Sequence, residues 1–563
     1  MTTFLGPRSG FFLCAGLVVR FALQAQQPAL PRAVPHDHVV AAAPAWSAPP
    51  RLVVGIVVDQ MRVDYIYRYW NNFGDGGFKR LIGEGAFLRD AQYPYVPTIT
   101  GPGHASIYTG TTPSHHGIVS NDRYDRASRT SIYCVADTTV SGVGGAGAIG
   151  QRSPAQLLAT TLGDELERRT DRQGHTVGVA LKDRSAILPI GRTGDEAFWF
   201  DATTGNFITS TWYMKELPRW VQDFNGRKLT AQYLGNTWRP LLPIERYHQV
   251  LPDENPYEQP LAAGGKAAFP YDLSALAKTA GPALIAATPW GNTLTTDIAL
   301  AAVNGEQLGQ DDITDLLAIS YSSTDILGHK MGPRALEVED MYIRLDQELA
   351  RLLTELDKAV GTGKYTLFLT ADHGAVDVPA YLRDLKGSGG YVDANALRDR
   401  LLRAMPAQVS GDTLAIDTMM EGQVYLSSGR NGTAELVAQQ LRSFPEVQDA
   451  FVVRGAAHGN ASPEEMRAMN GYMPQRGGDI LYTLKPGYFE AGGAFVGKGT
   501  THGSPWNYDT NVPVLLFGQG VKHTEVVRPT AITDIVPTVC MIIGCALPDA
   551  ATGAPVNEAL QGQ

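Results

Sequence analysis

The chain has 563 residues, 44% of them hydrophobic, with 57 acidic and 47 basic side chains and a net charge of −10. This length can hold roughly two to four domain-sized masses, or one large domain with insertions. The acidic balance argues against nucleic acid or an anionic membrane surface as the main partner, so we expect no nucleic-acid partner.

Residues 1–25 have the pattern of an export signal. Arg8 gives a positive start, GFFLCAGLVV an apolar segment, and ALQA a small-residue cleavage site ending at Ala25. The apolar segment is about half of the roughly 20 residues that a membrane-spanning helix needs. We therefore predict a signal peptide (1–25), a Pro/Ala-rich linker (26–50), no transmembrane segment in the mature chain, and a periplasmic or secreted location.

The first strand predicted after the linker ends in a carboxylate. RLVVGIVVDQ, residues 51–60, is a continuous apolar run that ends at Asp59. Such a run is typical of a strand buried on both faces of a parallel sheet. An Asp after a strand is usually a turn former or a helix cap, so this residue alone indicates no chemistry.

Two threonines then precede a short predicted helix in PTITGPGHASIYTG, residues 97–110. A threonine caps a helix when its side chain accepts hydrogen bonds from free backbone N–H groups. A threonine hydroxyl can also serve as a nucleophile when a metal ion lowers its pKa. This stretch by itself leaves both roles open for Thr98 and Thr100.

Two cations follow the next predicted strand in TVGVALKDR, residues 176–184. Lys182 and Arg184 would project to one face if the strand continues through them. Two fixed cations favour a phosphate monoester, with close to two negative charges and three free oxygens, over a diester with one charge. An isolated KDR is more often a solvated charged turn, so the interpretation depends on the other motifs.

Two further strands and the helix between them predict a parallel crossover unit. DLLAISYSSTD (315–325) ends at Asp325, and KYTLFLTADHG (364–374) carries Asp372 and His373. Between them, residues 336–360 place apolar side chains at steps of three and four, the pattern of an amphipathic helix. In open α/β sheets, ligands bind beyond the carboxyl ends of the strands, so these acidic residues should meet at one edge.

Three histidines join the three aspartates. His329 lies four residues after Asp325, which can place both side chains on one face of a helical turn, and His502 precedes another apolar strand. Mixed imidazole and carboxylate ligands suit zinc in partly open sites, and their number fits two ions better than one. Two ions about 4 Å apart can hold the attacking and leaving oxygens of a phosphoryl transfer.

Seven stretches in order resemble the alkaline phosphatase superfamily, in its branch of threonine-nucleophile bacterial alkaline phosphatases related to type I phosphodiesterases and nucleotide pyrophosphatases. They span residues 57–510, nearly the whole mature chain: VVDQMRVDY, PTITGPGHASIYTG, HHGIVSND, ALKDRSAI, STDILGH, TADHGA and GTTHGSPWNYDT.

The resemblance assigns roles to residues at matching positions. It implies that Thr100, and not Thr98, is the nucleophile, and that Asn121 binds phosphate beside Lys182 and Arg184, a pair that marks the monoesterases. It implies two zinc ions: one held by Asp325, His329 and His502, the other by Asp59, Asp372, His373 and Thr100. His104, His115 and His116 are expected to be structural.

The resemblance also implies an α/β fold with a central, mostly parallel sheet flanked by helices. We expect the catalytic domain at 51–545, cap insertions over the strand ends at about 200–300 and 380–495, and a tail at 546–563. Cys540 and Cys545 could form a disulfide, but two buried free thiols are favoured.

The resulting hypothesis is an exported dizinc alkaline phosphatase. It would hydrolyse small-molecule phosphate monoesters of broad range through a phosphothreonine intermediate. The alternative is a phosphodiesterase or nucleotide pyrophosphatase on the same scaffold.

Overall fold

The computed structural model describes residues 48–562 except 406–415, 428–432, 456–460 and 492–496. The predicted signal peptide and nearly all of the predicted linker lie outside the described residues. Among the described residues, no helix combines the length and the apolar composition needed to cross a membrane.

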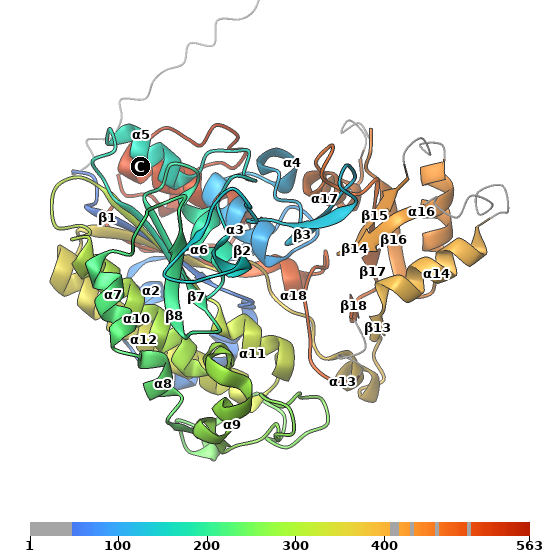
Figure 1. The fold of residues 1–563 in the computed structure, drawn as a ribbon, viewed down its shortest axis with the longest axis horizontal. Coiled ribbons are helices and arrows are strands. Elements are labelled where there is room, and N and C mark those ends of the chain that lie inside the picture. The colour runs from blue at the N-terminus through green and yellow to red at the C-terminus, as the bar shows by residue number, and fades with distance from the viewer. Residues whose placement is uncertain (1–47, 406–415, 428–432, 456–460, 492–496, 563) are drawn as a thin grey trace, which may run out of the picture. The chain divides into compact units, whose positions relative to one another are not determined.

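An 11-stranded sheet forms the centre of the fold (Figure 1). Its inner strands β12, β1, β11, β6 and β7 are parallel, whereas β19 and β8 join this group antiparallel on either side. In sheet order the strands are β20 (Thr524–Val526), β2 (Ala86–Gln92), β19 (Asn511–Gly518), β12 (Tyr365–Thr370), β1 (Leu52–Val58), β11 (Asp315–Tyr321), β6 (Thr176–Ala180), β7 (Glu196–Asp201), β8 (Asn206–Ser210) and β5 (Gly142–Val143), with β21 (Thr530–Ala531) beside β2.

Helices cover both faces of this sheet. On one face α10 packs on α12 and contacts β11 and β6, and on the other α6 packs on α3 and contacts β6, β7 and β11. The first group comprises α1 (Asp64–Tyr69), α2 (Phe78–Glu84), α7 (Arg219–Gly226), α10 (Pro289–Gly305), α11 (Ser323–Met331) and α12 (Leu336–Leu356). The second comprises α3 (Thr100–Thr109), α4 (Pro113–His116), α5 (Leu162–Arg169), α6 (Asp183–Ile190) and α19 (Ile535–Ile543).

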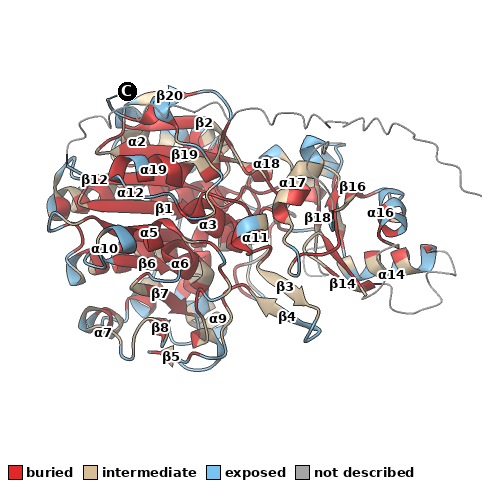
Figure 2. Cartoon of the chain, turned by 90° about the horizontal axis from the view of Figure 1, so that it is seen from above, coloured by how far each residue is buried: buried red, intermediate tan, exposed pale blue. Residues whose placement is uncertain are grey.

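The predicted crossover unit is confirmed. β11 and β12 both pair in parallel with β1, and α12 runs between them in the chain. The apolar positions of α12, from Val338 to Leu356, are buried in the main core. Figure 2 shows this core as buried strands between partly buried helices.

The range 200–300, which we expected to be a cap insertion, belongs in part to the sheet and its helical layers. β8 extends the sheet beside β7, and α10 buries Leu294 and Ile298 against it. β7 and β8 form an antiparallel pair, which extends the sheet, and α10 buries its apolar face against that sheet. The rest of this range holds α8 (Leu229–Tyr233), β9 (Thr237–Trp238), β10 (Tyr271–Asp272) and α9 (Leu273–Ala280).

Much of the second expected cap, 380–495, forms a lobe with its own core, which we call the cap lobe. A four-stranded antiparallel sheet in the order β14, β15, β17, β16 packs against α14 and α16. Its elements are α13 (Pro379–Asp384), β13 (Gly390–Val392), α14 (Ala394–Ala404), β14 (Ile416–Met420), β15 (Gln423–Leu426), α16 (Ala434–Arg442), β16 (Val447–Val452), α17 (Pro463–Gly471), β17 (Ile480–Leu484) and β18 (Tyr488–Glu490).

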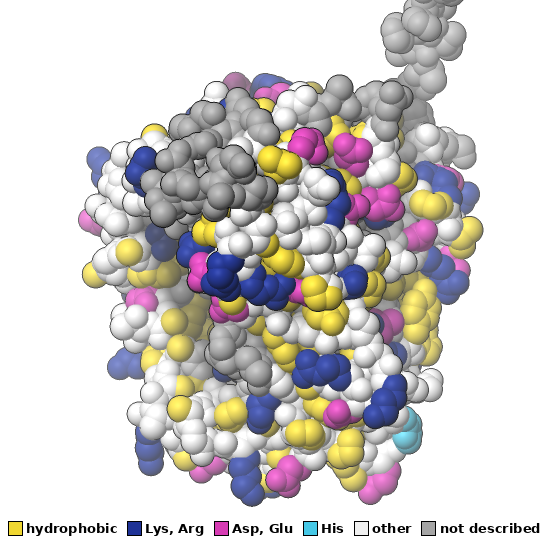
Figure 3. Space-filling model, turned by 90° about the vertical axis from the view of Figure 1, so that its right-hand side faces the viewer, with side chains coloured by type: hydrophobic (Ala, Val, Ile, Leu, Met, Phe, Trp, Pro, Cys, Tyr) yellow, Lys and Arg dark blue, Asp and Glu magenta, His cyan; other side chains and the backbone are white. Residues whose placement is uncertain are grey.

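The remaining segments and surfaces add little to the site. The expected tail packs on the main core, since Val556, Ala559 and Leu560 are buried. Cys134 and Cys540 are buried, Cys545 is half-buried, and all three are free thiols. On the face drawn in Figure 3, basic and acidic side chains are intermingled with hydrophobic ones.

Gly55 allows α3 to approach the central strand closely. A Cβ at this position would lie 2.2 Å from the Tyr108 hydroxyl oxygen and 2.6 Å from Phe368 Cζ, both of them side-chain atoms of the packed core. A collision of this kind costs about 1–3 kcal/mol when neighbours must shift. The close packing of α3 on β1 therefore requires a residue without a side chain at position 55.

We predict that Gly55→Ala lowers the melting temperature of the protein in a thermal unfolding experiment. Gly83→Ala is the matched control, because a Cβ at this position in α2 meets nothing within 4 Å. Replacing a helical glycine by alanine stabilises by about 0.5–1 kcal/mol, so this variant should melt at the same or a higher temperature. A Gly55→Ala protein as stable as the wild type would contradict the packing argument.

Candidate active site

The ends of three parallel strands bring the acidic residues together, as predicted. Val58 of β1 pairs with Tyr321 of β11, and Val57 pairs with Thr370 of β12, so the three strands end at the same level. Asp59 follows β1 directly, Asp372 lies two residues beyond β12, and Asp325 lies in the first turn of α11. The sheet thus converts three distant positions into one cluster.

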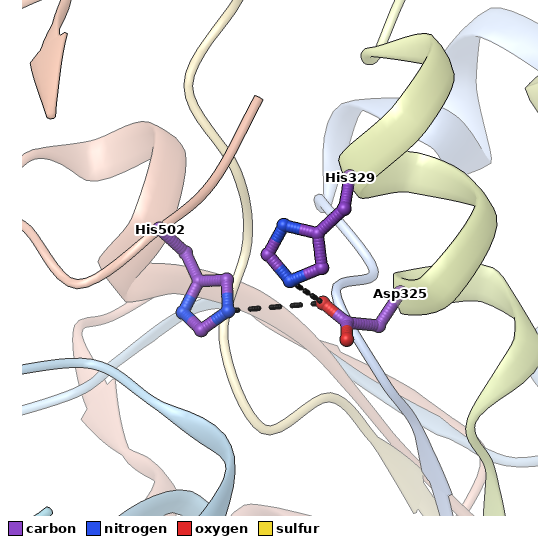
Figure 4. A group of neighbouring side chains, drawn as sticks. All are labelled: Asp325, His329 and His502. Carbon is purple, nitrogen blue, oxygen red and sulfur yellow. Dashed lines mark ion pairs between the residues drawn. The ribbon is translucent and has the colours of Figure 1, made fainter. Parts of the chain in front are cut away.

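Asp325, His329 and His502 form one group of potential metal ligands (Figure 4). The Nε2 atoms of His329 and His502 lie 3.1 and 3.7 Å from Asp325 Oδ1. His329 Nδ1 donates to the Thr500 carbonyl and His502 Nδ1 donates to the Thr98 carbonyl, each at 2.9 Å. Backbone carbonyls that hold Nδ1–H fix the tautomer and leave Nε2 as the ligand atom, a common arrangement of metal-binding histidines.

A second group contains Asp59 and Asp372, with two histidines beside them. His373 has the same arrangement as His329 and His502: Nδ1 is 2.9 Å from the Gly374 carbonyl, and Nε2 is 3.2 Å from Asp372 Oδ2. His104, which the sequence analysis set aside, also lies close, 3.6 Å from Asp59 Oδ1.

The hydrogen-bond partners of the two rings indicate which of these histidines suits a ligand role. His104 Nδ1 lies 3.0 Å from the Thr100 carbonyl, and Nε2 lies 3.1 Å from Ser320 Oγ, so both ring nitrogens have neutral partners. His373 Nε2 lies 3.2 Å from the Asp372 carboxylate and 3.4 Å from the Thr100 hydroxyl, so its neighbours include an ionisable oxygen and the proposed nucleophile. His373 therefore fits a ligand role better, and His104 fixes the first turn of α3.

The buried carboxylates of this cluster outnumber the lysine side chain that contacts them. Asp59 and Asp372 are fully buried, and Asp325 is 3% exposed. Burial raises the pKa of Asp59, and the neighbouring Asp372 carboxylate raises it further. Lys182 Nζ lies between the two groups, 2.8 Å from Asp59 Oδ2 and 2.6 Å from Asp325 Oδ2, while buried Asp372 Oδ2, 3.2 Å from His373 Nε2, accepts no well-aligned hydrogen bond from the described residues. Oxygen and imidazole donors around unmet negative charge fit divalent metal ions.

Neither threonine caps the helix. α3 begins at Thr100 itself, and its N-cap residue is Ile99, which has no capping side chain. Thr98 Oγ1 donates to the Ser504 carbonyl at 3.0 Å, away from the helix. Thr100 is 1% exposed, at the positive end of a ten-residue helix and within reach of the second ligand group.

Two further predicted side chains lie near this cluster. Asn121 Oδ1 accepts from the Gly101 backbone N–H at 2.8 Å, which leaves its Nδ2 group for a ligand. Arg184 Nη1 donates to the Tyr133 hydroxyl at 3.0 Å, whereas its buried Nε has no hydrogen-bond partner among the described residues. A cavity of about 320 Å³ is lined by Asn121, His329, His502 and residues of the cap lobe.

The predicted geometry of Lys182 and Arg184 is wrong in one respect. They do not project from one strand, because α6 begins at Asp183. Lys182 is the extended N-cap residue of α6, and Arg184 lies in its first turn. Lys182 consequently reaches the carboxylates, while Arg184 reaches Tyr133.

The sequence analysis missed Gln60, which joins the two ligand groups. Its backbone N–H donates to Asp372 Oδ1 at 2.9 Å, and its Nε2 donates to Asp325 Oδ1 at 2.6 Å. Its φ of 64° is in the left-handed region, which makes these two bonds possible from one residue. The one sequence signal was its position directly after Asp59 in a matching motif.

We predict that Gln60→Gly weakens metal retention by about 10- to 100-fold, the usual effect of losing a group that orients ligands. Glycine tolerates the left-handed backbone and keeps the N–H, so the variant removes only the side-chain bond to Asp325. The measurement is the divalent metal content of the protein after dialysis against graded chelator concentrations.

Gln475→Gly is the control for this experiment, because Gln475 is exposed and also has a positive φ, 73°. It should retain metal like the wild type. Equal retention by Gln60→Gly and the wild type would remove Gln60 from the site.

Comparisons with known proteins agree with this geometry. Residues 53–504 match the family described as type I phosphodiesterase / nucleotide pyrophosphatase. A protein of Myroides odoratus named calcium-transporting ATPase is 42% identical over 91% of this chain and 95% of its own length. Alkaline phosphatase PafA of Elizabethkingia meningoseptica is 42% identical over 91% of this chain and 94% of its own length.

The fold agrees as well. The crystal structure of wild-type alkaline phosphatase PafA matches with a TM-score of 0.86 and 40% identity, covering 91% of this chain and 99% of that one. The family match extends over most of the chain and includes all three strand ends that carry the buried aspartates. The chain therefore belongs to the type I phosphodiesterase / nucleotide pyrophosphatase family, in the branch of the alkaline phosphatase superfamily that contains these bacterial alkaline phosphatases.

Proposed function

We propose that this chain is an exported alkaline phosphatase that hydrolyses phosphate monoesters of broad range through a covalent phosphothreonine on Thr100. One observation carries the proposal: the buried Thr100 hydroxyl at the start of α3 lies 3.4 Å from His373 Nε2, in a carboxylate–imidazole cluster that Lys182 also contacts. The resemblance to alkaline phosphatase PafA supports it. Export rests on the signal-like residues 1–25.

We propose zinc as the metal, at two ions per chain. Asp325, His329 and His502 would hold one ion, and Asp59, Asp372, His373 and the Thr100 hydroxyl the other. When bound, zinc would lower the pKa of a coordinated hydroxyl or water and neutralise charge on the leaving oxygen. Elemental analysis of the wild-type protein in the Gln60 experiment identifies the ion.

The other side chains would bind and orient the phosphoryl group. Thr100 Oγ1 attacks phosphorus, helped by the positive end of α3. The Asn121 amide and the Arg184 guanidinium donate hydrogen bonds to non-bridging oxygens. Tyr133 holds Arg184 in place through its hydroxyl, and the Asp183 carboxylate in turn accepts from that hydroxyl. Lys182 stands between the two ligand groups and balances the charge of Asp59 and Asp325.

The rival function is hydrolysis of phosphodiesters or nucleotide pyrophosphates, which the description of the family itself favours. Two half-buried cations at the start of α6, Lys182 and Arg184, favour the monoester, because its phosphoryl group has an additional charge and a third free oxygen to bind. The rates on a monoester and on its methyl diester separate the two functions.

We predict that Thr100→Ala abolishes nearly all turnover and the covalent intermediate, whereas Thr100→Ser retains part of both. Thr98→Ala should be much milder, because Thr98 Oγ1 is hydrogen-bonded to the Ser504 carbonyl. The measurements are steady-state rates and acid-quench trapping of labelled phosphoprotein. If Thr98→Ala were the more damaging alanine variant, the assignment of the nucleophile would be wrong.

We predict that Lys182→Ala combined with Arg184→Ala lowers kcat/KM for monoesters by about 10²- to 10⁴-fold. Each charge-assisted hydrogen bond is worth roughly 1.5–3 kcal/mol, and about 1.4 kcal/mol corresponds to a tenfold change. Diester hydrolysis should fall less. The metal content of the double variant must be measured alongside, because Lys182 contacts two proposed ligands. If kcat/KM fell equally for both esters while the metals were retained, Lys182 and Arg184 would not be the residues that select monoesters over diesters.

A further inference from the structure

The cap lobe reaches the cavity through an unusual turn. β14 and β15 are joined by Glu421 and Gly422, whose φ angles of 48° and 73° are both positive. Two-residue hairpin turns with two positive φ values favour Asn or Asp followed by Gly. Glutamate in the left-handed region is strained, and such strain is concentrated at functional sites.

The surrounding residues hold this turn firmly. Glu490 Oε1 accepts from the Gly422 backbone N–H at 2.8 Å and from the Tyr482 hydroxyl at 2.5 Å. The Tyr482 backbone N–H donates to the Gly422 carbonyl at 2.8 Å. These bonds hold the backbone of the turn and so give Glu421 a defined position in the chain fold.

That position is in the wall of the cavity. Glu421 and Gly422 line it together with Asn121, His329 and His502. Glu421 Oε2 is shielded from solvent and has no hydrogen-bond partner among the described residues. A carboxyl oxygen in this state costs free energy unless a ligand or a proton satisfies it.

The charged groups around Glu421 come from three neighbouring elements. Arg184 of α6 is the cation, and Asp122 of β3 (Asp122–Asp125) and Glu490 of β18 are the anions. The pKa of Glu421 is raised to about 8, first by burial and then by Asp122 and Glu490, while Arg184 and the Asn121 backbone N–H oppose the rise. Among the part of the chain that the structure describes, the buried Nε of the same Arg184 has no hydrogen-bond partner.

We propose that Glu421 is a residue of the phosphoryl pocket, supplied by the cap lobe, whose carboxylate weakens the binding of inorganic phosphate in alkaline solution. The proposal rests on the proposed phosphatase function. Arg184 and Asn121 attract the phosphoryl group, and an ionised Glu421 beside them repels a dianion. The protein thus limits how tightly its product is held. Protonation of the carboxyl group as the pH falls removes this repulsion.

The test compares phosphate inhibition of monoester hydrolysis by zinc-loaded wild type and Glu421→Gln between pH 6.5 and 9.5. Phosphate has the same ionisation state in both experiments at a given pH, so the ratio of the two inhibition constants does not depend on the titration of phosphate itself. The variant should bind phosphate about tenfold more tightly at pH 9.5, the effect expected of one unit charge in a partly desolvated site, and equally at pH 6.5. If the substitution altered only the structure of the turn, the ratio of inhibition constants would not change with pH in this way.

Two further variants keep the result interpretable. Glu421→Asn removes the charge and supplies a residue that the turn prefers, so it should bind phosphate more tightly and melt at no lower temperature than the wild type. Glu435→Gln, on the exposed face of α16 in the same lobe, should leave phosphate binding unchanged. A ratio that is flat across the pH range, or weaker phosphate binding by both Glu421 variants, overturns the proposal. Failure of the proposed function is distinct, because the wild type would then not hydrolyse monoesters.

Discussion

Everything in this site depends on the mutual repulsion of three buried carboxylates. Asp59, Asp325 and Asp372 stand at the ends of neighbouring parallel strands with almost no contact with solvent. A protein can keep such a group ionised only if cations and hydrogen-bond donors surround it. Lys182 supplies one cation, the backbone N–H of Gln60 supplies one donor, and the histidine Nε2 atoms complete two groups of candidate metal ligands.

The orientation of those histidines links the site to distant parts of the chain. Nδ1 of His502 is held by the carbonyl of Thr98, which lies just ahead of the proposed nucleophile, and Nδ1 of His329 is held by the carbonyl of Thr500. The rings of His373 and His502 stack with centroids 3.4 Å apart. The loop that carries His502 and the turn that carries Thr100 thus position each other, which brings proposed ligands more than 400 residues apart into one site.

The cap lobe contributes further residues to the wall of the cavity. It has its own hydrophobic core, so it can present the β14–β15 turn rigidly without depending on the main sheet. Two acids of this lobe, Glu421 and Glu490, line the cavity, and Arg184 on α6 is the cation that interacts with Glu421. The proposed attraction and repulsion of phosphate would therefore come from different layers of the fold.

The sequence by itself determined the strands, the amphipathic helix at 336–356, the acidic residues at strand ends and the family resemblance, because these follow from local hydrophobic patterns and short motifs. Local pattern could not show whether Thr98 or Thr100 caps the helix, since both fit a turn before a helix, and only the family resemblance assigned the nucleophile to Thr100. The sequence analysis also misplaced Lys182 and Arg184 on one strand and singled out neither Gln60 nor Glu421. Only the tertiary structure showed the surroundings of these side chains, because their partners lie far away in the chain: Ser504 for Thr98, Asp325 for Gln60, Asn121 and Arg184 for Glu421. Local pattern fixes which face of an element is buried, but the contacts of a polar side chain are set by whichever element the fold brings opposite to it.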